Sequence, residues 1–569
     1  MLRRVTACLA LLFVVPTLAS AQTGPDRLLP AGSQLYFRWD GFDAQRSAYE
    51  KTAVGQMMKG DTGKFLDALW DWINNAADLA GQADPQAPVM IKDALKIVAG
   101  VGKNGLTLSV EVKQFTPPQA QVTLVFPKAA KEGVLLPFVQ RLTGMANAPV
   151  QETKVGKRSV THINVQFVNF GWWGEGEDVV FVAGTEDPVA YAKMIDSNET
   201  GLANAPLYKQ VNSFKEFPIV SRAYLDIAAL AKMGGGVSPE IDRLIEDLGL
   251  KSVKSVTFVS GYDGPAERAI AEIDIPGPRK GLLALIGQKK INLTNLPPLP
   301  DDITSFSASN FNAGRIYDAG IEIVTAGVRM FAPDQADNIK EGIKQFEGIL
   351  GVKLGDDLFG SFDDMTVSYS TPSEGPLGLG GVYLFKVKND QKLNSALEAL
   401  GRAIPNLPIP GANFEFKKRT YHGVEINELH LNTPGNFNIP CYAVHKGWLV
   451  FSSYPQSIYG FVLRSKGELP TWKADAKLTE ALKAFPKDFT SISVSDPRPT
   501  VKFVFSALPP LLSLANGFTQ FAPGLRPFDV GLVPHAQAAS RHLFPNITVT
   551  TDDGKKIRSE TRASLALPF

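Results

Sequence analysis

The chain has 569 residues, of which 44% are hydrophobic and 20% charged. This composition is ordinary for globular protein, and the length allows several hydrophobic cores. The 58 lysines and arginines nearly balance the 57 acidic residues, giving a formal net charge of +1, so nothing in the charge favours nucleic acid as a partner.

The N-terminus has the pattern of a secretory signal peptide. Arg3 and Arg4 precede an apolar stretch, and small residues follow at Ala19-Ser20-Ala21. We therefore predict a signal peptide over residues 1–21, with the mature chain beginning at Gln22 and lying in the periplasm or outside the cell.

Cleavage there would remove Cys8 and leave Cys441 as the only cysteine. An intrachain disulfide is then impossible, so the fold must depend on burial. Beyond the signal we find no uncharged run of about 18 apolar residues, and we expect no transmembrane segment.

A proline-led turn that opens into a strand occurs four times. It leads from Pro30 into Leu35–Asp40 and recurs at Pro218, Pro300 and Pro486. The spacings are nearly equal: 218 − 30 = 188 and 486 − 300 = 186. We therefore predict an internal duplication of a large and a small unit. The predicted first half is 22–297, with units 29–216 and 217–290, and the second is 298–569, with units 299–484 and 485–569.

In the first half, apolar periodicity and alternation predict helices interspersed with strands. The helices are expected from Asp61 or Thr62, over Val89–Ala99, over Gly133–Leu142 and from Asp187, and the strands over Leu106–Val112, Ala120–Phe126, Ser159–Phe170 and Asp178–Ala183.

The second half repeats this order. Its helices are expected over Asp337–Leu350, Leu393–Ala403 and Pro455–Leu463, and its strands over Thr366–Tyr369, Gly381–Val387, Thr420–Leu431, Cys441–His445 and Trp448–Ser452.

Each small unit contains a predicted hairpin, at Asp263-Gly264 and at Asp553-Gly554. The second small unit also has an insertion over Ala507–Ser540, whose structure the sequence does not assign, and Leu293–Pro300 is the best linker between the halves. The expected fold class is α+β, internally duplicated, with helices packed on one face of antiparallel sheets.

Five stretches form a recognisable pattern: Ile349-Leu350-Gly351-Val352, Asp356-Asp357-Leu358-Phe359, Thr366–Tyr369, the hairpin over 442–453, and Leu29-Pro30-Ala31-Gly32-Ser33 followed by Tyr36. This pattern resembles uncharacterised bacterial secreted proteins with a domain of unknown function. The resemblance covers most of the second large unit and, more loosely, the first. It implies an exported α+β protein and brings no catalytic residues.

The densest set of potential metal ligands is His422, Glu425, Glu428 and His430. On one extended strand, the two histidines would lie about 26 Å apart and could not share an ion. We therefore interpret this set as a solvated strand face and predict no metal and no cofactor. Cys441 is interpreted as a small core residue.

The adjacent tryptophans Trp172 and Trp173 are the candidate binding feature. Flanking glycines at 171 and 174 suggest a loop, and an exposed tryptophan is often an anchor for a protein or a sugar ring. The alternative is that this loop folds back over a sheet edge.

We find no Gly-x-Ser-x-Gly elbow and no His-Glu-x-x-His helix. The leading hypothesis is therefore an exported, non-catalytic binding or structural protein of the cell envelope, with a protein or envelope component as partner. Two alternatives stay open: an exported hydrolase whose site forms only in the fold, and a carrier of apolar ligands covered by the 507–540 segment.

Overall fold

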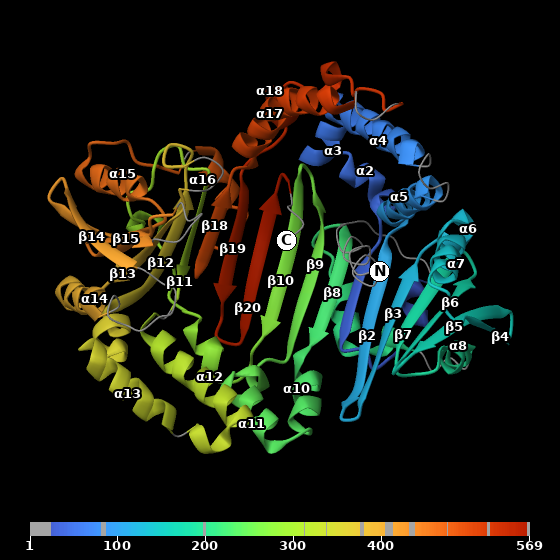
Figure 1. The fold of residues 1–569 in the computed structure, drawn as a ribbon, viewed down its shortest axis with the longest axis horizontal. Helices are drawn as coiled ribbons and strands as arrows, with labels where there is room; N and C mark the ends of the chain where they lie inside the picture. Colours follow the sequence, from blue (N-terminus) through green and yellow to red (C-terminus); the bar gives the residue numbers. More distant parts are fainter. Residues whose placement is uncertain are drawn as a thin grey trace.

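The structure is a computed structural model that describes residues 24–80, 87–196, 201–311, 313–336, 338–375, 380–403, 414–431, 438–474, 476–519 and 524–565. The predicted signal peptide lies outside these residues. The described strands form one antiparallel sheet of 20 strands, with helices around it (Figure 1). The α+β class expected from the sequence is confirmed.

Ten strands of the sheet come from the first half of the chain. In pairing order they are β4 (Gln151–Val155), β5 (Arg158–Val165), β6 (Val168–Glu175), β7 (Asp178–Gly184), β3 (Pro118–Phe126), β2 (Leu106–Phe115), β1 (Leu35–Trp39), β8 (Ile219–Asp226), β9 (Ser255–Asp263) and β10 (Ala266–Asp274).

The second half contributes ten strands with the same pairing order. They are β14 (Phe414–Tyr421), β15 (Val424–Leu431), β16 (Cys441–His445), β17 (Trp448–Ser452), β13 (Val382–Val387), β12 (Phe362–Ser370), β11 (Ser305–Asn310), β18 (Ser491–Ser495), β19 (Asn546–Asp552) and β20 (Lys556–Ala563). The halves meet where β10 pairs with β20. Whether they superpose as a duplication stays a prediction.

Helices cover both faces of the sheet, whereas one face was expected. In the first half, α8 (Pro188–Asp196) and α9 (Pro206–Asn212) pack on the face that carries Tyr36 and Trp173. On the other face, α5 (Ala87–Asn104) and α7 (Leu135–Met145) pack against Trp39. Tyr36 and Trp39 are three residues apart on β1, so alternation sends them to opposite faces.

The second half is covered in the same two-sided way. Helices α15 (Pro455–Lys466) and α16 (Ala476–Leu482) enclose the larger core, and α14 (Asp390–Ala403) packs on part of the opposite face. Below the strand ends in Figure 1 lie α10 (Ile227–Gly235), α11 (Pro239–Asp247), α12 (Ile316–Phe331) and α13 (Asn338–Leu350).

The insertion that the sequence left unassigned joins the two halves a second time. It contains the end of α17 (Pro497–Phe518) and the short α18 (Ala536–Ser540), which arch toward α2 (Arg46–Tyr49), α3 (Ala53–Met58) and α4 (Asp61–Ala80) in Figure 1. The ring of Phe528 lies 5.8 Å from that of Phe65. The indole nitrogen of Trp72 donates a hydrogen bond to the Arg526 carbonyl at 2.8 Å.

Two predicted strands are in fact hairpins. The stretch over Ser159–Phe170 reverses at Gln166-Phe167, and Thr420–Leu431 reverses at His422-Gly423. The turns carry positive φ at Gln166 and at both His422 and Gly423. A glutamine or histidine in that conformation is uncommon, which is why the turn signals did not appear in the sequence. Helix α5 also runs past Gly100 and ends before Gly105.

Candidate functional site

One face of the second-half sheet carries an array of hydroxyl side chains. Strands β11 and β18 read Ser-Phe-Ser-Ala-Ser and Ser-Ile-Ser-Val-Ser, so alternation places serines on one face and apolar residues in the core. Three neighbouring strands extend the pattern. We call this surface the hydroxyl face; its residues are Ser305, Ser307, Ser309, Thr366, Ser368, Ser370, Ser491, Ser493, Ser495, Thr548, Thr550, Ser559 and Thr561.

The strand register brings these residues side by side. Ser307 lies between Ser368 of β12 and Ser493 of β18, and Ser493 is opposite Thr548 of β19. Every residue of the hydroxyl face is half-buried, while the intervening residues Phe306 and Ile492 are fully buried in the core on the other side. The hydroxyl face is therefore partly exposed to solvent along its whole extent.

Some hydroxyl groups pair with one another and others do not. The Oγ atoms of Ser305 and Ser370 are 2.9 Å apart, and the Oγ1 atoms of Thr548 and Thr561 are 2.8 Å apart. In the part of the chain that the structure describes, no side-chain hydrogen bond is recorded for the central serines 307, 368, 491, 493 and 495. Because each hydroxyl offers one donor and two acceptor positions, this centre can bond water or a polar ligand.

An exposed aromatic pair borders the hydroxyl face. Tyr383 of β13 is opposite Ser368 and next to Phe451 of β17. Tyr383 is 54% exposed and Phe451 is 39% exposed, with ring centroids 6.5 Å apart. Helix α14 covers Phe385 on the same strand but leaves Tyr383 open. The two rings are therefore an exposed aromatic surface next to the hydroxyl face.

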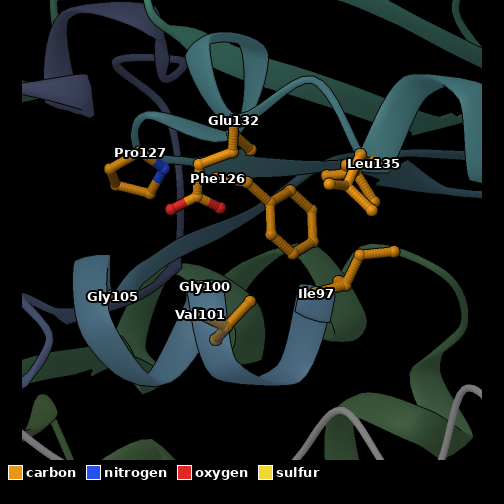
Figure 2. Close-up of a pocket in the computed structure, with 10 residues that line it drawn as sticks. Ile97, Gly100, Val101, Gly105, Phe126, Pro127, Glu132 and Leu135 are labelled. Carbon is orange, nitrogen blue, oxygen red and sulfur yellow. The ribbon is translucent and has the colours of Figure 1, made fainter. Parts of the chain in front are cut away.

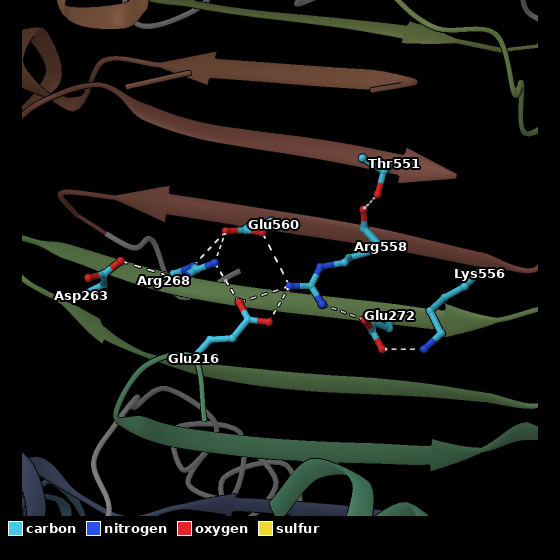
Figure 3. A network of polar contacts seen from close by, with 8 residues as sticks. All are labelled: Glu216, Asp263, Arg268, Glu272, Thr551, Lys556, Arg558 and Glu560. Carbon is cyan, nitrogen blue, oxygen red and sulfur yellow. Dashed lines mark hydrogen bonds and ion pairs between the residues drawn. The ribbon is translucent and has the colours of Figure 1, made fainter. Parts of the chain in front are cut away.

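The hydroxyl face has no charged residue among its members, in contrast to the reverse side of the sheet. There, at the junction of the halves, Arg268 and Arg558 bind Glu216, Glu272 and Glu560 (Figure 3). A ligand of the hydroxyl face thus meets hydroxyls and aromatic rings and no ionic group on the array.

The structure corrects the prediction for Trp172 and Trp173. Both belong to β6 and not to a loop, and their side chains are only 7% and 1% exposed. Trp172 stacks with Phe181 at 6.3 Å, and Trp173 packs against Tyr191 at 6.4 Å on the other face. Alternation sends the two rings to opposite faces of β6, and both faces are packed at this point, so neither ring is left exposed. The binding role that required an exposed ring has no support here.

The predicted ligand cluster is spread along the β14–β15 hairpin. His422 is in the turn and pairs with Glu468 at 3.5 Å, while His430 is at the far end of β15 and lies 3.1 Å from Glu428. Burial tends to raise the pKa of Glu428, but hydrogen bonds from His430 and Arg419 lower it below its ordinary value. No group of three His, Cys, Asp or Glu that could hold a metal occurs among the described residues.

Cys441 is fully buried on β16. Burial, with a smaller effect of Glu428, raises the pKa of its thiol to about 12. A reactive cysteine requires the thiolate, so this thiol is suited to packing and not to nucleophilic attack.

A small pocket in the first half is too tight to be a ligand site. It lies between the end of α5 and the start of α7, lined by Val101, Phe126, Glu132 and Leu135 (Figure 2). Its volume is about 10 Å³, room for about one water molecule. Glu132 accepts a hydrogen bond from Asn104 at 2.7 Å and closes the space.

No family model and no curated protein matches the chain. Among solved structures, crystal form III of TP0453 is 10% identical with a TM-score of 0.23, covering 48% of this chain and 84% of that one. Crystal form I of the same protein is 10% identical with a TM-score of 0.22, covering 46% and 81%. This likeness is too low to carry an argument. Within the described residues, no helix has the length and apolar character to cross a membrane.

A serine repeat is the sequence signal that predicts the hydroxyl face. Two Ser-x-Ser-x-Ser stretches, at 305–309 and 491–495, are visible in the sequence. The position of the aromatic pair beside them depends on strand register across four strands, which residue spacing alone does not give.

Proposed function

We propose that the protein is an exported, non-catalytic binding protein of the cell envelope, and that its hydroxyl face binds neutral glycan. The observation that carries the proposal is the exposed pair Tyr383 and Phe451 at the border of an uncharged hydroxyl array. Aromatic rings contribute a large apolar contact area, and the apolar faces of sugar rings fit against it. Sugar hydroxyls can meanwhile exchange hydrogen bonds with the central serines.

The geometry favours a long ligand over a single sugar. Alternate side chains on a strand are about 6.6–6.8 Å apart and neighbouring strands about 4.8 Å apart, so the array is flat and repetitive. A flat face lacks the concave walls that bury most of a small ligand. A polymer gains affinity by many weak contacts along such a face.

The described residues give less support to the two alternative functions, hydrolase and carrier of apolar ligands. A hydrolase needs acid, base or nucleophile groups that converge in one place, and the histidines considered for that role are at opposite ends of β15. A carrier of apolar ligands needs a large dry cavity, whereas Arg526 and Phe528 of the 507–540 segment contact helix α4 of the first half.

Affinity electrophoresis tests the proposal. The purified protein is run through gels containing dextran, a mixed-linkage β-glucan or a mannan, and we expect retardation by at least one of them. The variant Tyr383→Ala/Phe451→Ala should lose most of that retardation. The control Phe167→Ala/Phe503→Ala removes two aromatic rings exposed elsewhere and should migrate like the wild type. Equal migration of wild type and Tyr383→Ala/Phe451→Ala in every gel contradicts the proposal.

A further inference from the structure

A cleft in the second half of the chain is on the other side of the same sheet. It is an open cleft of about 720 Å³. Its walls come from the predicted linker over 293–299, from β13, from the β16–β17 turn, from α15 and from residues 471–474. Because Lys386 and Trp448 are each three residues from an exposed aromatic, alternation places this cleft on the face opposite Tyr383 and Phe451.

Positive charge is concentrated in the cleft. Lys386, Lys446, Lys473 and Arg464 line it, and no carboxylate does so among the described residues. The Arg464 charge is already balanced, because Glu374 binds its guanidinium and the Tyr369 hydroxyl lies 2.6 Å from Nη2. For the three lysines no ion pair is recorded within the described part of the chain, so they are a net excess of positive charge.

Two of these lysines are held in place. The Lys386 ammonium lies 4.8 Å from the centroid of the Trp448 ring, a cation–π contact. The Lys446 ammonium donates a hydrogen bond to the carbonyl of Ser465 on α15. Neither contact neutralises the charge, so both groups keep donor positions for an anion.

A partly buried histidine, His445, lies next to Lys446 of the cleft. The pKa of His445 is lowered, first by burial and then by Lys446 and Lys466. Its Nε2 lies 2.8 Å from the hydroxyl of Ser465, which also lines the cleft.

An aromatic wall accompanies the cations. Trp472 is half-buried and packs edge-on against Phe306 at 4.9 Å. Its backbone nitrogen donates to the Leu299 carbonyl at 2.9 Å, which attaches this segment to the linker. Arg464 also donates to the carbonyl of Pro298 at 3.1 Å, fixing the linker to α15. The cleft is thus a built structure with charge on one wall and an indole on another.

We propose that this cleft binds a phosphate or carboxylate group attached to a ring. The ammonium groups would meet the anion, and the indole of Trp472 would contact the ring. The inference is independent of glycan binding, since the two sites share no residue and lie on opposite faces.

Isothermal titration calorimetry tests it with four probes: phenyl phosphate, benzoate, inorganic phosphate and benzyl alcohol. We expect phenyl phosphate or benzoate to bind at least tenfold more tightly than both of the other probes, since only these two combine charge and ring. Whichever of the two binds more tightly identifies the anion. Equal affinity for benzyl alcohol and both ring anions, or no binding of either ring anion, overturns the proposal.

Matched variants locate the binding. Lys386→Gln/Lys473→Gln should raise the dissociation constant of the tighter-binding ring anion at least tenfold. The control Lys487→Gln/Lys555→Gln removes the same charge from exposed sites outside the cleft and should change this dissociation constant less than twofold. Trp472→Ala should lower the affinity for the ring anion to nearly the affinity for inorganic phosphate. Thermal melting of each variant checks its fold. If the two lysine pairs have equal effects, binding reflects overall charge and the cleft is not the site.

Discussion

Arg268 and Glu560 connect the two halves of the chain across the β10–β20 junction. The Nη2 atom of Arg268 lies 2.6 Å from Oε1 of Glu560, and its Nε donates to the same oxygen at 2.9 Å. Both side chains are largely buried, and the guanidinium also lies 5.2 Å from the Phe217 ring centroid. This pair is at the centre of the network in Figure 3.

Removing one partner should therefore destabilise the protein strongly. We expect Arg268→Ala to lower the free energy of unfolding by about 3 kcal/mol or more, because Glu560 would stay buried without its principal cation. Urea denaturation measures the change. The control Arg562→Ala breaks a more exposed pair with Asp263 and should cost about 1 kcal/mol or less. If both variants lower the free energy of unfolding equally, the buried pair at the junction stabilises the fold no more than the exposed pair does.

Glu267, next to Arg268 on β10, predicts a pH dependence of stability. Burial raises the pKa of this carboxyl from 4.5 to about 7, and no cation is recorded beside it among the described residues. Between these values the folded state binds more protons than the unfolded state, so stability falls as the pH rises. The loss is complete once the pH exceeds the folded pKa.

The variant Glu267→Gln removes this titration. It should nearly match the wild type at pH 4.5 and be more stable at pH 8 by about 3 kcal/mol, because the folded pKa of about 7 lies 7 − 4.5 = 2.5 units above the ordinary value and each unit corresponds to about 1.4 kcal/mol. Thermal or urea unfolding across this pH range measures the difference. Glu272→Gln on the same strand is the contrasting variant, since Lys556 and Arg558 lower the pKa of Glu272 against the effect of burial. A constant difference between Glu267→Gln and wild type at all pH values would refute this account.

The two adjacent tryptophans give a third prediction. Trp173→Ala should cost about 3–5 kcal/mol of folding stability, the range for a buried aromatic, and Trp172→Ala should cost a similar amount. Trp70→Ala removes an exposed indole on α4 and should cost much less, about 0.5 kcal/mol. Urea denaturation compares the three. A cost below 1 kcal/mol at Trp173 would mean that the strand β6 is not packed as described.

Export is a fourth prediction and rests on the sequence alone. Intact-mass analysis of protein from the native host should give a chain beginning at Gln22. A mass that retains Met1, or a lipid attached to Cys8, contradicts the proposed signal peptide.

Much of the fold followed from local pattern. Strong alternation and clear turn residues located the hairpins at Asp263-Gly264 and Asp553-Gly554, and apolar periodicity located helices such as α4, α5 and α15, but α10, α11, α12 and α17 were not predicted. The hairpins at Gln166-Phe167 and His422-Gly423 were missed because the first has no glycine or proline and the second pairs its glycine with an unusual histidine. The exposure expected at Trp172 and Trp173 was wrong because burial depends on which segments cover each face, and that is a property of the whole sheet.

The candidate sites were less predictable. The serines of β11 and β18 are about 190 residues apart in sequence, at 305–309 and 491–495, yet they pair directly. The cleft needs residues from five segments, and each of its lysines looks like an ordinary surface residue in the sequence. Strand register and packing bring the residues of both sites together, and neither can be deduced from residue spacing in the sequence.

The central claim is that the exposed pair Tyr383 and Phe451 holds a neutral glycan on the hydroxyl face. Its most direct test is the dissociation constant for the polysaccharide that retards the wild type most, obtained from mobility at several polysaccharide concentrations. We predict that Tyr383→Ala/Phe451→Ala raises this constant about 30-fold, equivalent to about 2 kcal/mol and typical of a hot spot. Phe167→Ala/Phe503→Ala should leave it within a factor of two. An unchanged dissociation constant in the Tyr383→Ala/Phe451→Ala variant, with an unchanged melting temperature, would contradict the claim.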